Sequence, residues 1–376
     1  MADETKDIAG FDKTDAGVLK SKEWESVSDR KVRVGLAGYG VCCFGTAFGF
    51  QDHPNVEVVA VTDLDPDRCK IMAENARCDT MFASVEEMVR DDNVEAIFIA
   101  TDAPSHARLA ILALEHGKHV GSCVPAVHGS LQDAEDLYNA VKSSGMKYMM
   151  FETSAFQADC YMMREAYNAG LLGEILYSEG QYYHYFPDAL GGHGNWRAGI
   201  PPMWYPTHAT AYHIAVTGGS YTDVSCIGYN GGNIEHLQAE NNDYNNSFDS
   251  QTALFKTSEG GMSRMNIFWG AAGSHGEYGS VQGEKAAIFG TKITPEVEDT
   301  SQFAKPQLPP TMDAGGHGGS HAYLTDEFIT AILEDRDPLI NIAWSLNMTV
   351  PGIVAHESSL KDGEWMPVPQ YTWPPA

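Results

Sequence analysis

The chain has 376 residues, enough for two domains that each bury a sizeable core. Its formal net charge of −27 at pH 7 argues against nucleic acid or an anionic membrane surface as a partner, because phosphates would be repelled along most of the exterior. Seven cysteines without a C-x-x-C spacing predict reduced thiols and no structural zinc site. The first residues lack the basic and apolar segments of a leader peptide, and no apolar run is long enough to span a membrane, so we expect a cytoplasmic protein.

Residues 1–30 are polar and aperiodic, which predicts an arm that lies on the surface or on a neighbouring subunit. An alternating apolar run at 32–36 then predicts a strand, followed by a tight turn at Gly38 and Gly40 and the start of a helix. Such a turn lets backbone N–H groups approach a pyrophosphate, which the helix N-terminus also attracts. The third glycine of G-x-G-x-x-G is absent, because Cys43 occupies that position.

A second buried strand is predicted at 56–65, and it ends in Asp63. A carboxylate there would accept a hydrogen bond from a ribose 2′-hydroxyl. The glycine turn and this acid together favour NAD over NADP, since a 2′-phosphate would face the carboxylate. The alternative is an α/β domain with a glycine turn that binds no nucleotide.

Strand and helix continue to alternate along the next hundred residues. Asp65 and Pro66 predict the start of a helix that runs to about residue 76, and Ser84 with Glu87 predicts a capping box. Further strands are predicted at 94–101, 119–123 and 147–153, with helices near 107–114 and 130–144. Repeated βα units of this length form a parallel sheet with right-handed crossovers. Residues 31–155 are therefore expected to form one Rossmann-type, doubly wound domain.

Residues 156–376 have a different pattern. After a helix at 159–169, several candidate strands follow with few helices between them, which predicts an α+β domain with a large, mostly antiparallel open sheet. Helices return near 320–333 and 353–360. An open sheet leaves one face to be covered, so we expect a homodimer or homotetramer.

The first domain resembles the glucose-fructose oxidoreductase, inositol dehydrogenase and MocA family of sugar oxidoreductases. The similarity lies in Gly38-x-Gly40, in Asp63, and in the stretches TDAPSH at 101–106 and EHGKHVGSCVP at 115–125. It implies that NAD binds along these motifs, at Gly38, Tyr39, Gly40, Val41, Cys42, Asp63, Thr101, Asp102, His106, Cys123, Val124, Pro125 and Glu152.

One position departs from that family in a way that affects the chemistry. The family strand usually ends in Glu-Lys-Pro, and its lysine helps the substrate hydroxyl to lose a proton. This chain has Cys123, Val124 and Pro125 there. Valine can neither hydrogen-bond nor carry a proton, so other groups must perform the acid–base chemistry.

Histidines and tyrosines gather within residues 182–213, and glycines and prolines around 199–206 predict a loop there. This segment resembles the NAD-dependent glycosidases of the same superfamily, such as the α-N-acetylgalactosaminidases. The matching residues are Tyr182 and His184, the pair Trp196 and Arg197, Tyr205-Pro206-Thr207-His208, the Met-Met-x-Glu strand end at 149–152, and His317-Gly318-Gly319. The alternative is an aromatic-rich loop whose histidines are merely hydrogen-bonded.

The resemblance implies hydrolysis by transient oxidation. NAD⁺ would oxidise the sugar at C3, the C1 substituent would leave, water would add, and C3 would be reduced again. We expect His208 to be the main base, with Tyr182 and Tyr205 as proton carriers or oxyanion donors. His184, Trp196, Arg197 and His317 are expected to bind the sugar. The chain departs from the α-N-acetylgalactosaminidases at two places, because Ala-Thr-Ala-Tyr follows His208 and Cys123 replaces an acidic residue. The resemblance therefore does not imply that the sugar is N-acetylgalactosamine.

Other functions remain open. An NAD-dependent sugar dehydrogenase could use His208 in place of the missing lysine, and a binding protein could have lost catalysis with that lysine. A conventional glycosidase with paired carboxylates leaves the nucleotide fold unexplained. No metal is expected, because His208 and His213 lie five residues apart, which is not a usual ligand spacing on a helix.

Overall fold

The computed structural model describes residues 23–375 apart from 42, 190, 192 and 274. Most of the predicted N-terminal arm and the predicted cofactor residue Cys42 therefore lie outside the described residues. The described end of the arm is anchored to the second half of the chain, because the indole Nε1 of Trp24 donates a 2.9 Å hydrogen bond to Asp326.

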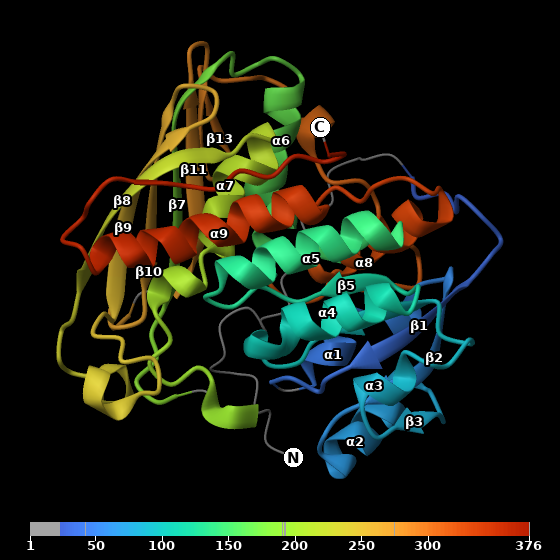
Figure 1. The fold of residues 1–376 in the computed structure, drawn as a ribbon. Helices are drawn as coiled ribbons and strands as arrows, with labels where there is room; N and C mark the ends of the chain where they lie inside the picture. Colours follow the sequence, from blue (N-terminus) through green and yellow to red (C-terminus); the bar gives the residue numbers. More distant parts are fainter. Residues whose placement is uncertain (1–22, 42, 190, 192, 274, 376) are drawn as a thin grey trace.

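The first domain is built on a six-stranded parallel sheet in the order β3-β2-β1-β4-β5-β6, which confirms the predicted Rossmann-type fold (Figure 1). The strand order reverses between β1 and β4, where parallel α/β sheets open a crevice at the carboxyl ends of their strands. The strands are β1 (Val32–Ala37), β2 (Val56–Thr62), β3 (Met81–Phe82), β4 (Ala96–Ile99), β5 (His119–Ser122) and β6 (Tyr148–Met150).

Helices connect these strands close to the predicted positions. Asp65 caps the second helix by accepting hydrogen bonds from the N–H groups of Asp67 and Arg68, and Pro66 occupies its first turn. Ser84 caps the third helix in the same way. The helices are α1 (Phe44–Ala47), α2 (Pro66–Ala76), α3 (Val85–Met88), α4 (His106–Glu115) and α5 (Leu131–Ser144).

The second domain contains an eight-stranded sheet in the order β13-β12-β11-β7-β10-β9-β8-β14. Its described pairs are antiparallel except β7 with β10, so the predicted mostly antiparallel sheet is confirmed. The strands are β7 (Ile175–His184), β8 (Tyr221–Tyr229), β9 (Ser250–Thr257), β10 (Met262–Phe268), β11 (His275–Gly283), β12 (Ala287–Phe289), β13 (Lys292–Thr294) and β14 (Met366–Pro367).

Helices cover one face of this sheet. α7 (Thr207–Thr217) contacts β7, β10 and β11, and α9 (Ile342–Ser359) contacts β8 and β9 (Figure 1). α6 (Ala158–Asn168) packs against α7. Large apolar side chains remain exposed on the strands, at Leu176, Ile227, Tyr229, Leu254, Met262 and Tyr278. Association of copies through this sheet stays a prediction.

Two helices differ from their predicted extents. The segment around His208 is predicted as a loop, but only its first part is irregular, and from Thr207 it forms helix α7, which is buried except at its last residue. Helix α9 begins at Ile342, well before the predicted start near residue 353, and it continues through Pro351. Tertiary packing overrides the helix-breaking tendency of that proline, because nearly all of α9 is buried.

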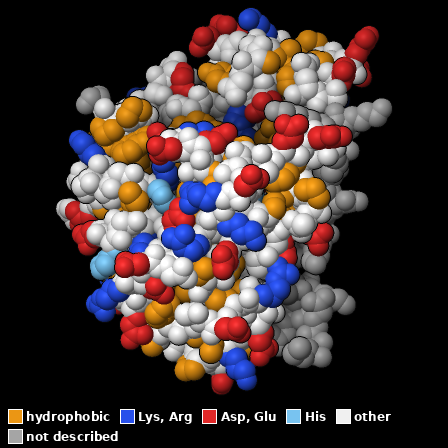
Figure 2. Space-filling model, turned by 90° about the vertical axis from the view of Figure 1, so that its right-hand side faces the viewer, with side chains coloured by type: hydrophobic (Ala, Val, Ile, Leu, Met, Phe, Trp, Pro, Cys, Tyr) orange, Lys and Arg blue, Asp and Glu red, His pale blue; other side chains and the backbone are white. Residues whose placement is uncertain are grey.

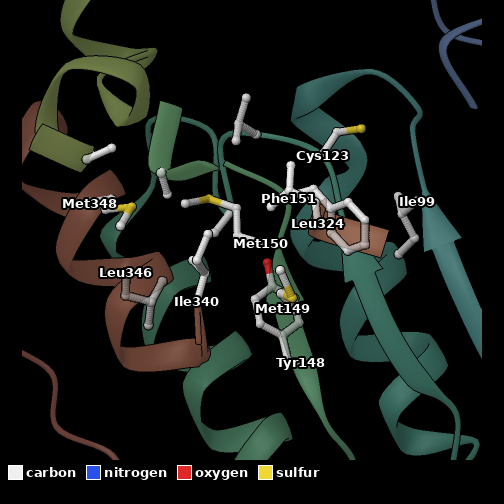
Figure 3. Packing of buried hydrophobic residues seen from close by; sticks show 14 of the residues in the cluster. Ile99, Cys123, Tyr148, Met149, Met150, Phe151, Leu324, Ile340, Leu346 and Met348 are labelled. Atoms are coloured by element: carbon white, nitrogen blue, oxygen red, sulfur yellow. The ribbon is translucent and has the colours of Figure 1, made fainter. Parts of the chain in front are cut away.

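One apolar core joins the two domains. Met150 at the end of β6 lies beside Ile340, whose carbonyl accepts a 3.2 Å hydrogen bond from the Met150 N–H, and Leu346 and Met348 of α9 pack nearby (Figure 3). Helix α8 (His321–Leu333) contacts β1 of the first domain. The second half of the chain therefore returns to the first sheet and encloses the crevice at its carboxyl edge.

The outer surface carries mixed charge. On the face in Figure 2, acidic side chains are spread widely, with Lys and Arg interspersed among them. No described helix is long and apolar enough to cross a membrane. The six described cysteines are buried and have free thiols.

Candidate active site

The glycine turn after β1 has the geometry that close approach of a pyrophosphate requires. Gly38 has φ +94°, and a Cβ atom there would lie 2.7 Å from backbone atoms of Ala100 and Thr101. Gly40 also lies in the left-handed region, with φ +64°. Only glycine occupies such positions without strain, so backbone N–H groups of this turn can lie against a ligand.

Gly45 performs the packing role of the missing third glycine. A Cβ atom on Gly45 would lie 2.3 Å from the carbonyl oxygen of Gly38, so the short helix α1 can cross the turn only with glycine there. Cys43, at the position where the motif has its glycine, has φ 60° and is the N-cap residue of α1. The turn is therefore complete although the sequence motif is broken.

Asp63 directly follows β2 beside this turn. Its Oδ2 accepts a 2.6 Å hydrogen bond from the Tyr39 N–H and its Oδ1 accepts a 2.8 Å bond from the Asp65 N–H. The carboxylate lines a cavity of about 660 Å³, a volume in the range of ligand sites. The predicted residues that line this cavity are Gly38, Gly40, Val41, Asp63, Thr101, Asp102, Trp196 and Arg197. These groups fit a dinucleotide with free ribose hydroxyls.

A second cavity adjoins the first at Gly40, Val41, Thr101, Trp196 and Arg197. It lies between the first sheet and the helix-covered face of the second. All seven residues predicted for catalysis or sugar binding line it: Tyr182, His184, Trp196, Arg197, Tyr205, His208 and His317. The predicted residues His106, Cys123 and Val124 line it from the first domain.

Three residues predicted to bind the cofactor have other surroundings. The Arg68 guanidinium lies over the ring of Tyr39, with its Cζ atom 5.6 Å from the centroid of that ring. The carbonyl of Pro125 lies 2.9 Å from Nδ1 of His106 and helps to fix that ring. Glu152 lines neither cavity described above, and it is fully buried beneath His208.

His208 lies beside two buried carboxylates. Its Nδ1 is 2.8 Å from Oε1 of Glu152 and 3.6 Å from Oε1 of Glu277. Burial alone would lower the pKa of His208, but the two carboxylates raise it to about 9. At neutral pH the ring is therefore an imidazolium. A protonated ring donates a proton before it can accept one, so the expected role of first base requires His208 to lose its proton beforehand.

Glu277 is absent from the residues predicted from the sequence. It lies in β11 opposite Tyr182 of β7, and its Oε2 accepts hydrogen bonds from the side chains of Ser154, at 2.7 Å, and Gln157. Burial raises the pKa of this carboxyl, and the His208 cation opposes that effect. A glutamate within a strand of small residues was the available signal, but only the strand pairing places it beneath His208.

The other histidines of the cavity have lowered pKa values. Burial, and then the charge of Arg197, lowers the pKa of His184 to about 3. Burial and the neighbouring His321 and His208 hold the pKa of His317 well below its usual value. At neutral pH the cavity therefore contains one cationic histidine beside neutral ones.

Aromatic and cationic groups complete the wall. The rings of Tyr182 and His208 are 4.6 Å apart, and those of Tyr205 and His208 are 5.6 Å apart. Burial raises the pKa of Tyr205 to about 12, so its hydroxyl is a donor at neutral pH. The Arg197 guanidinium stacks on Trp196 at 4.1 Å. Among the described residues, no group of three or more His, Cys, Asp or Glu side chains is placed to hold a metal ion.

Residues 32–152 match an oxidoreductase family, GFO_IDH_MocA, which is described as having an NAD-binding Rossmann fold. The first domain therefore matches the NAD-binding domain of this oxidoreductase family. The predicted family resemblance and the predicted cofactor, NAD, are thereby confirmed.

Curated relatives carry two kinds of name. Glycosyl hydrolase family 109 protein 1 of Bacteroides fragilis is 30% identical over 176 residues, which cover 44% of this chain and 38% of the relative. Family 109 protein 2 of Phocaeicola vulgatus is 30% identical over 47% of each chain. An oxidoreductase of Streptococcus pneumoniae is 26% identical over 270 residues, or 68% of each chain. The chain thus matches less than half of the length of the glycosyl hydrolase relatives.

Solved structures share the fold over nearly the whole chain. Levoglucosan dehydrogenase in complex with NADH and L-sorbose superposes with a TM-score of 0.73 at 17% identity, covering 91% of this chain and 100% of that one. An NAD-binding oxidoreductase of Klebsiella pneumoniae gives a TM-score of 0.71 at 16% identity, with the same coverage.

Proposed function

We propose that this protein is an NAD-dependent glycoside hydrolase that oxidises its sugar transiently at C3, eliminates the C1 substituent, adds water and restores the C3 hydroxyl. The observation that carries the proposal is the contact of His208 with two buried carboxylates, which favours a proton on its ring. A dehydrogenase needs one base, whereas an elimination also needs an acid for the leaving group. His208 is a buried imidazolium facing the cavity, and Val124 stands where the dehydrogenases have their lysine.

NAD would be held by the glycine turn at Gly38 and Gly40 and by Asp63. When bound, it supplies a hydride acceptor at C3 and returns the hydride at the end, so that none is consumed. Thr101 lines both cavities, and the apolar side chains of Cys123 and Val124 in the sugar cavity would exclude water there.

Proton transfers fall to the groups around His208. Nδ1 of His208 is engaged by the carboxylates, so Nε2 is the nitrogen available to a bound sugar. The rings of Tyr182 and Tyr205 lie beside this ring, and their hydroxyls would donate to the oxygen that becomes negative during the reaction. His184, Trp196 and Arg197 would hold the sugar hydroxyls and orient C1, and His317 lines the same cavity.

A second function is favoured by the likeness in fold. A sugar dehydrogenase would use the same cavity, and the superposition with levoglucosan dehydrogenase covers far more of the chain than the glycosyl hydrolase matches do. It differs in outcome, because NADH would accumulate in step with substrate loss.

The experiment that separates the two uses aryl glycosides of several sugars and both anomers. Enzyme stripped of nucleotide is assayed with and without a trace of NAD⁺, while aglycone and NADH are followed together. Many aglycone releases per NAD⁺ without lasting NADH support the hydrolase. NADH formed in step with substrate loss, without aglycone, supports the dehydrogenase and overturns the proposal.

A further inference from the structure

Two histidines of the sugar cavity lie side by side with different hydrogen bonds. The rings of His208 and His317 are nearly parallel, at 16°, with their centroids 6.2 Å apart. Both rings line the same cavity. Both can therefore reach neighbouring atoms of one small molecule.

The hydrogen bonds behind His317 fix which of its nitrogens carries the proton. Nδ1 of His321 lies 3.1 Å from the carbonyl oxygen of Ala47, which can only accept, so this nitrogen carries the proton. Nε2 of His321 then has a lone pair, and it accepts from Nδ1–H of His317 at 2.8 Å. A neutral His317 with its proton on Nδ1 has a basic lone pair on Nε2.

A competing contact defines the alternative tautomer. The Gly316 N–H lies 3.3 Å from Nδ1 of His321, and it would need a lone pair on that nitrogen. That arrangement would move the proton of His317 to Nε2 and make it a donor. The shorter contact to the Ala47 carbonyl favours the first arrangement, and the two tautomers can be told apart experimentally.

The backbone at His317 is held in an uncommon conformation. Its φ is 47°, in the left-handed region, between Gly316 and Gly318. The ring packs edge-on against Phe44, with centroids 5.9 Å apart, while its Nδ1 is bonded to α8. Such a conformation persists only where the surrounding contacts determine it, and it often marks a functional residue.

We propose that His317 is the base that removes the C2 proton of the sugar, and that His208 is the acid that protonates the departing C1 oxygen. This inference rests on the proposed function. The C2–H electron pair becomes the C1–C2 double bond, and the proton goes to Nε2 of His317. The C1–O pair leaves with the aglycone oxygen, which takes a proton from Nε2 of His208. One proton enters the pair of histidines and one leaves it.

The charges make the two transfers support each other. A proton gained by His317 beside the His208 cation would place two positive rings 6.2 Å apart, which is unfavourable in a buried site. Loss of the His208 proton removes that repulsion. Proton removal at C2 is therefore favoured when the leaving oxygen is protonated at the same time.

The tautomer is tested without substrate. In protein labelled with ¹⁵N-histidine, the His317 ring is assigned by its loss in His317→Asn, a side chain that tolerates the left-handed backbone. We expect Nδ1 of His317 to carry the proton and its Nε2 to be unprotonated between about pH 6 and 8. A proton on Nε2 in that range would overturn the assignment of the base.

The roles are tested with glycosides of one sugar that differ in leaving group. For His208→Gln, the loss of rate should grow as the leaving group becomes less acidic, from a nitrophenol to an alkyl alcohol. For His317→Asn, we expect a loss of ~10²-fold or more that is equal for all leaving groups. The isotope effect of deuterium at C2 should rise in His317→Asn, because proton removal then limits the rate. The proposal would be overturned if the loss of rate depended on the leaving group in His317→Asn and were independent of it in His208→Gln.

The failure of the two proposals is distinguishable. If no glycoside releases its aglycone with the unmodified enzyme, the proposed hydrolase and this inference both fall. If aglycone is released and His317→Asn retains the full rate, only the assignment of the base falls. Thermal unfolding of each variant shows that a lost rate does not come from a lost fold.

Discussion

His208 and Glu152 form a buried ion pair in which Nδ1 of the imidazole lies 2.8 Å from Oε1 of the carboxylate. Together with Glu277, this carboxylate keeps the pKa of His208 at about 9, against the effect of burial. An acid on this histidine should remain active up to that pH and lose activity above it. The basic limb of the pH profile therefore reports the ion pair.

Glu152→Gln should move that limb to lower pH. The amide oxygen can still accept from Nδ1–H, so the ring keeps its orientation while the negative charge is lost. We expect the basic limb of kcat/KM to fall by about one pH unit or more, since a neighbouring charge shifts a pKa by that amount. The matched control is Glu179→Gln, which removes a carboxylate paired with Arg264 at 3.0 Å on the exposed side of the sheet. An unchanged limb in Glu152→Gln would contradict the assignment of the limb to His208.

The same pKa predicts how His208 contributes to stability. Its pKa is raised from 6.5 in the unfolded chain to about 9, so the stabilisation is fully present below pH 6.5 and is lost as the pH rises towards 9. The difference in unfolding free energy between the wild type and His208→Gln should shrink by an amount on the order of 3 kcal/mol between pH 6 and 9.5. Urea unfolding at both pH values measures it.

His184 should behave in the opposite way. Its pKa is lowered to about 3 in the folded protein, so its contribution to stability is present above pH 6.5 and is lost as the pH falls from 6.5 towards 3. The same urea series with His184→Gln should therefore diverge from the wild type at neutral pH and converge in acid. Parallel curves for the two variants would contradict the pKa directions of both rings.

Much of the first domain could be predicted because its signals are local. The glycine turn, the Asp65 cap and the apolar strands each depend on residues that are close together in the sequence. The hydrogen bonds of Glu277 and of His321 could not be predicted, because they depend on which strands and helices become neighbours. The alternation of apolar residues shows which side of a strand is buried. The pairing of His275 with His184 joins two strands that are far apart in the sequence, so it is known only from the fold.

The cofactor site yields a prediction at Gly45. Gly45→Ala would place a methyl group 2.3 Å from the Gly38 carbonyl, so the turn must move away from its ligand. We expect NAD⁺ to bind at least about tenfold more weakly, since distortion of the turn removes backbone hydrogen bonds to the pyrophosphate. Titration of tryptophan fluorescence with NAD⁺ measures the Kd. Gly191→Ala is the control, because a Cβ atom there meets no atom of the described part of the chain within 4 Å.

The last prediction concerns His321, which acts only through His317. Removing the acceptor at its Nε2 should release His317 from the tautomer that carries the lone pair on Nε2, because the 2.8 Å bond between the two rings fixes it. His321→Leu removes both hydrogen bonds but keeps an apolar side chain in the buried site. His321→Gln retains an amide oxygen that can accept from Nδ1–H of His317. We expect kcat to fall at least about tenfold in the Leu variant and to recover partly in the Gln variant, with KM nearly constant in both. A purely structural role for His321 predicts instead that kcat follows the melting temperature, whichever side chain is present. Equal losses in two equally stable variants would therefore remove His321 as the residue that orients the base.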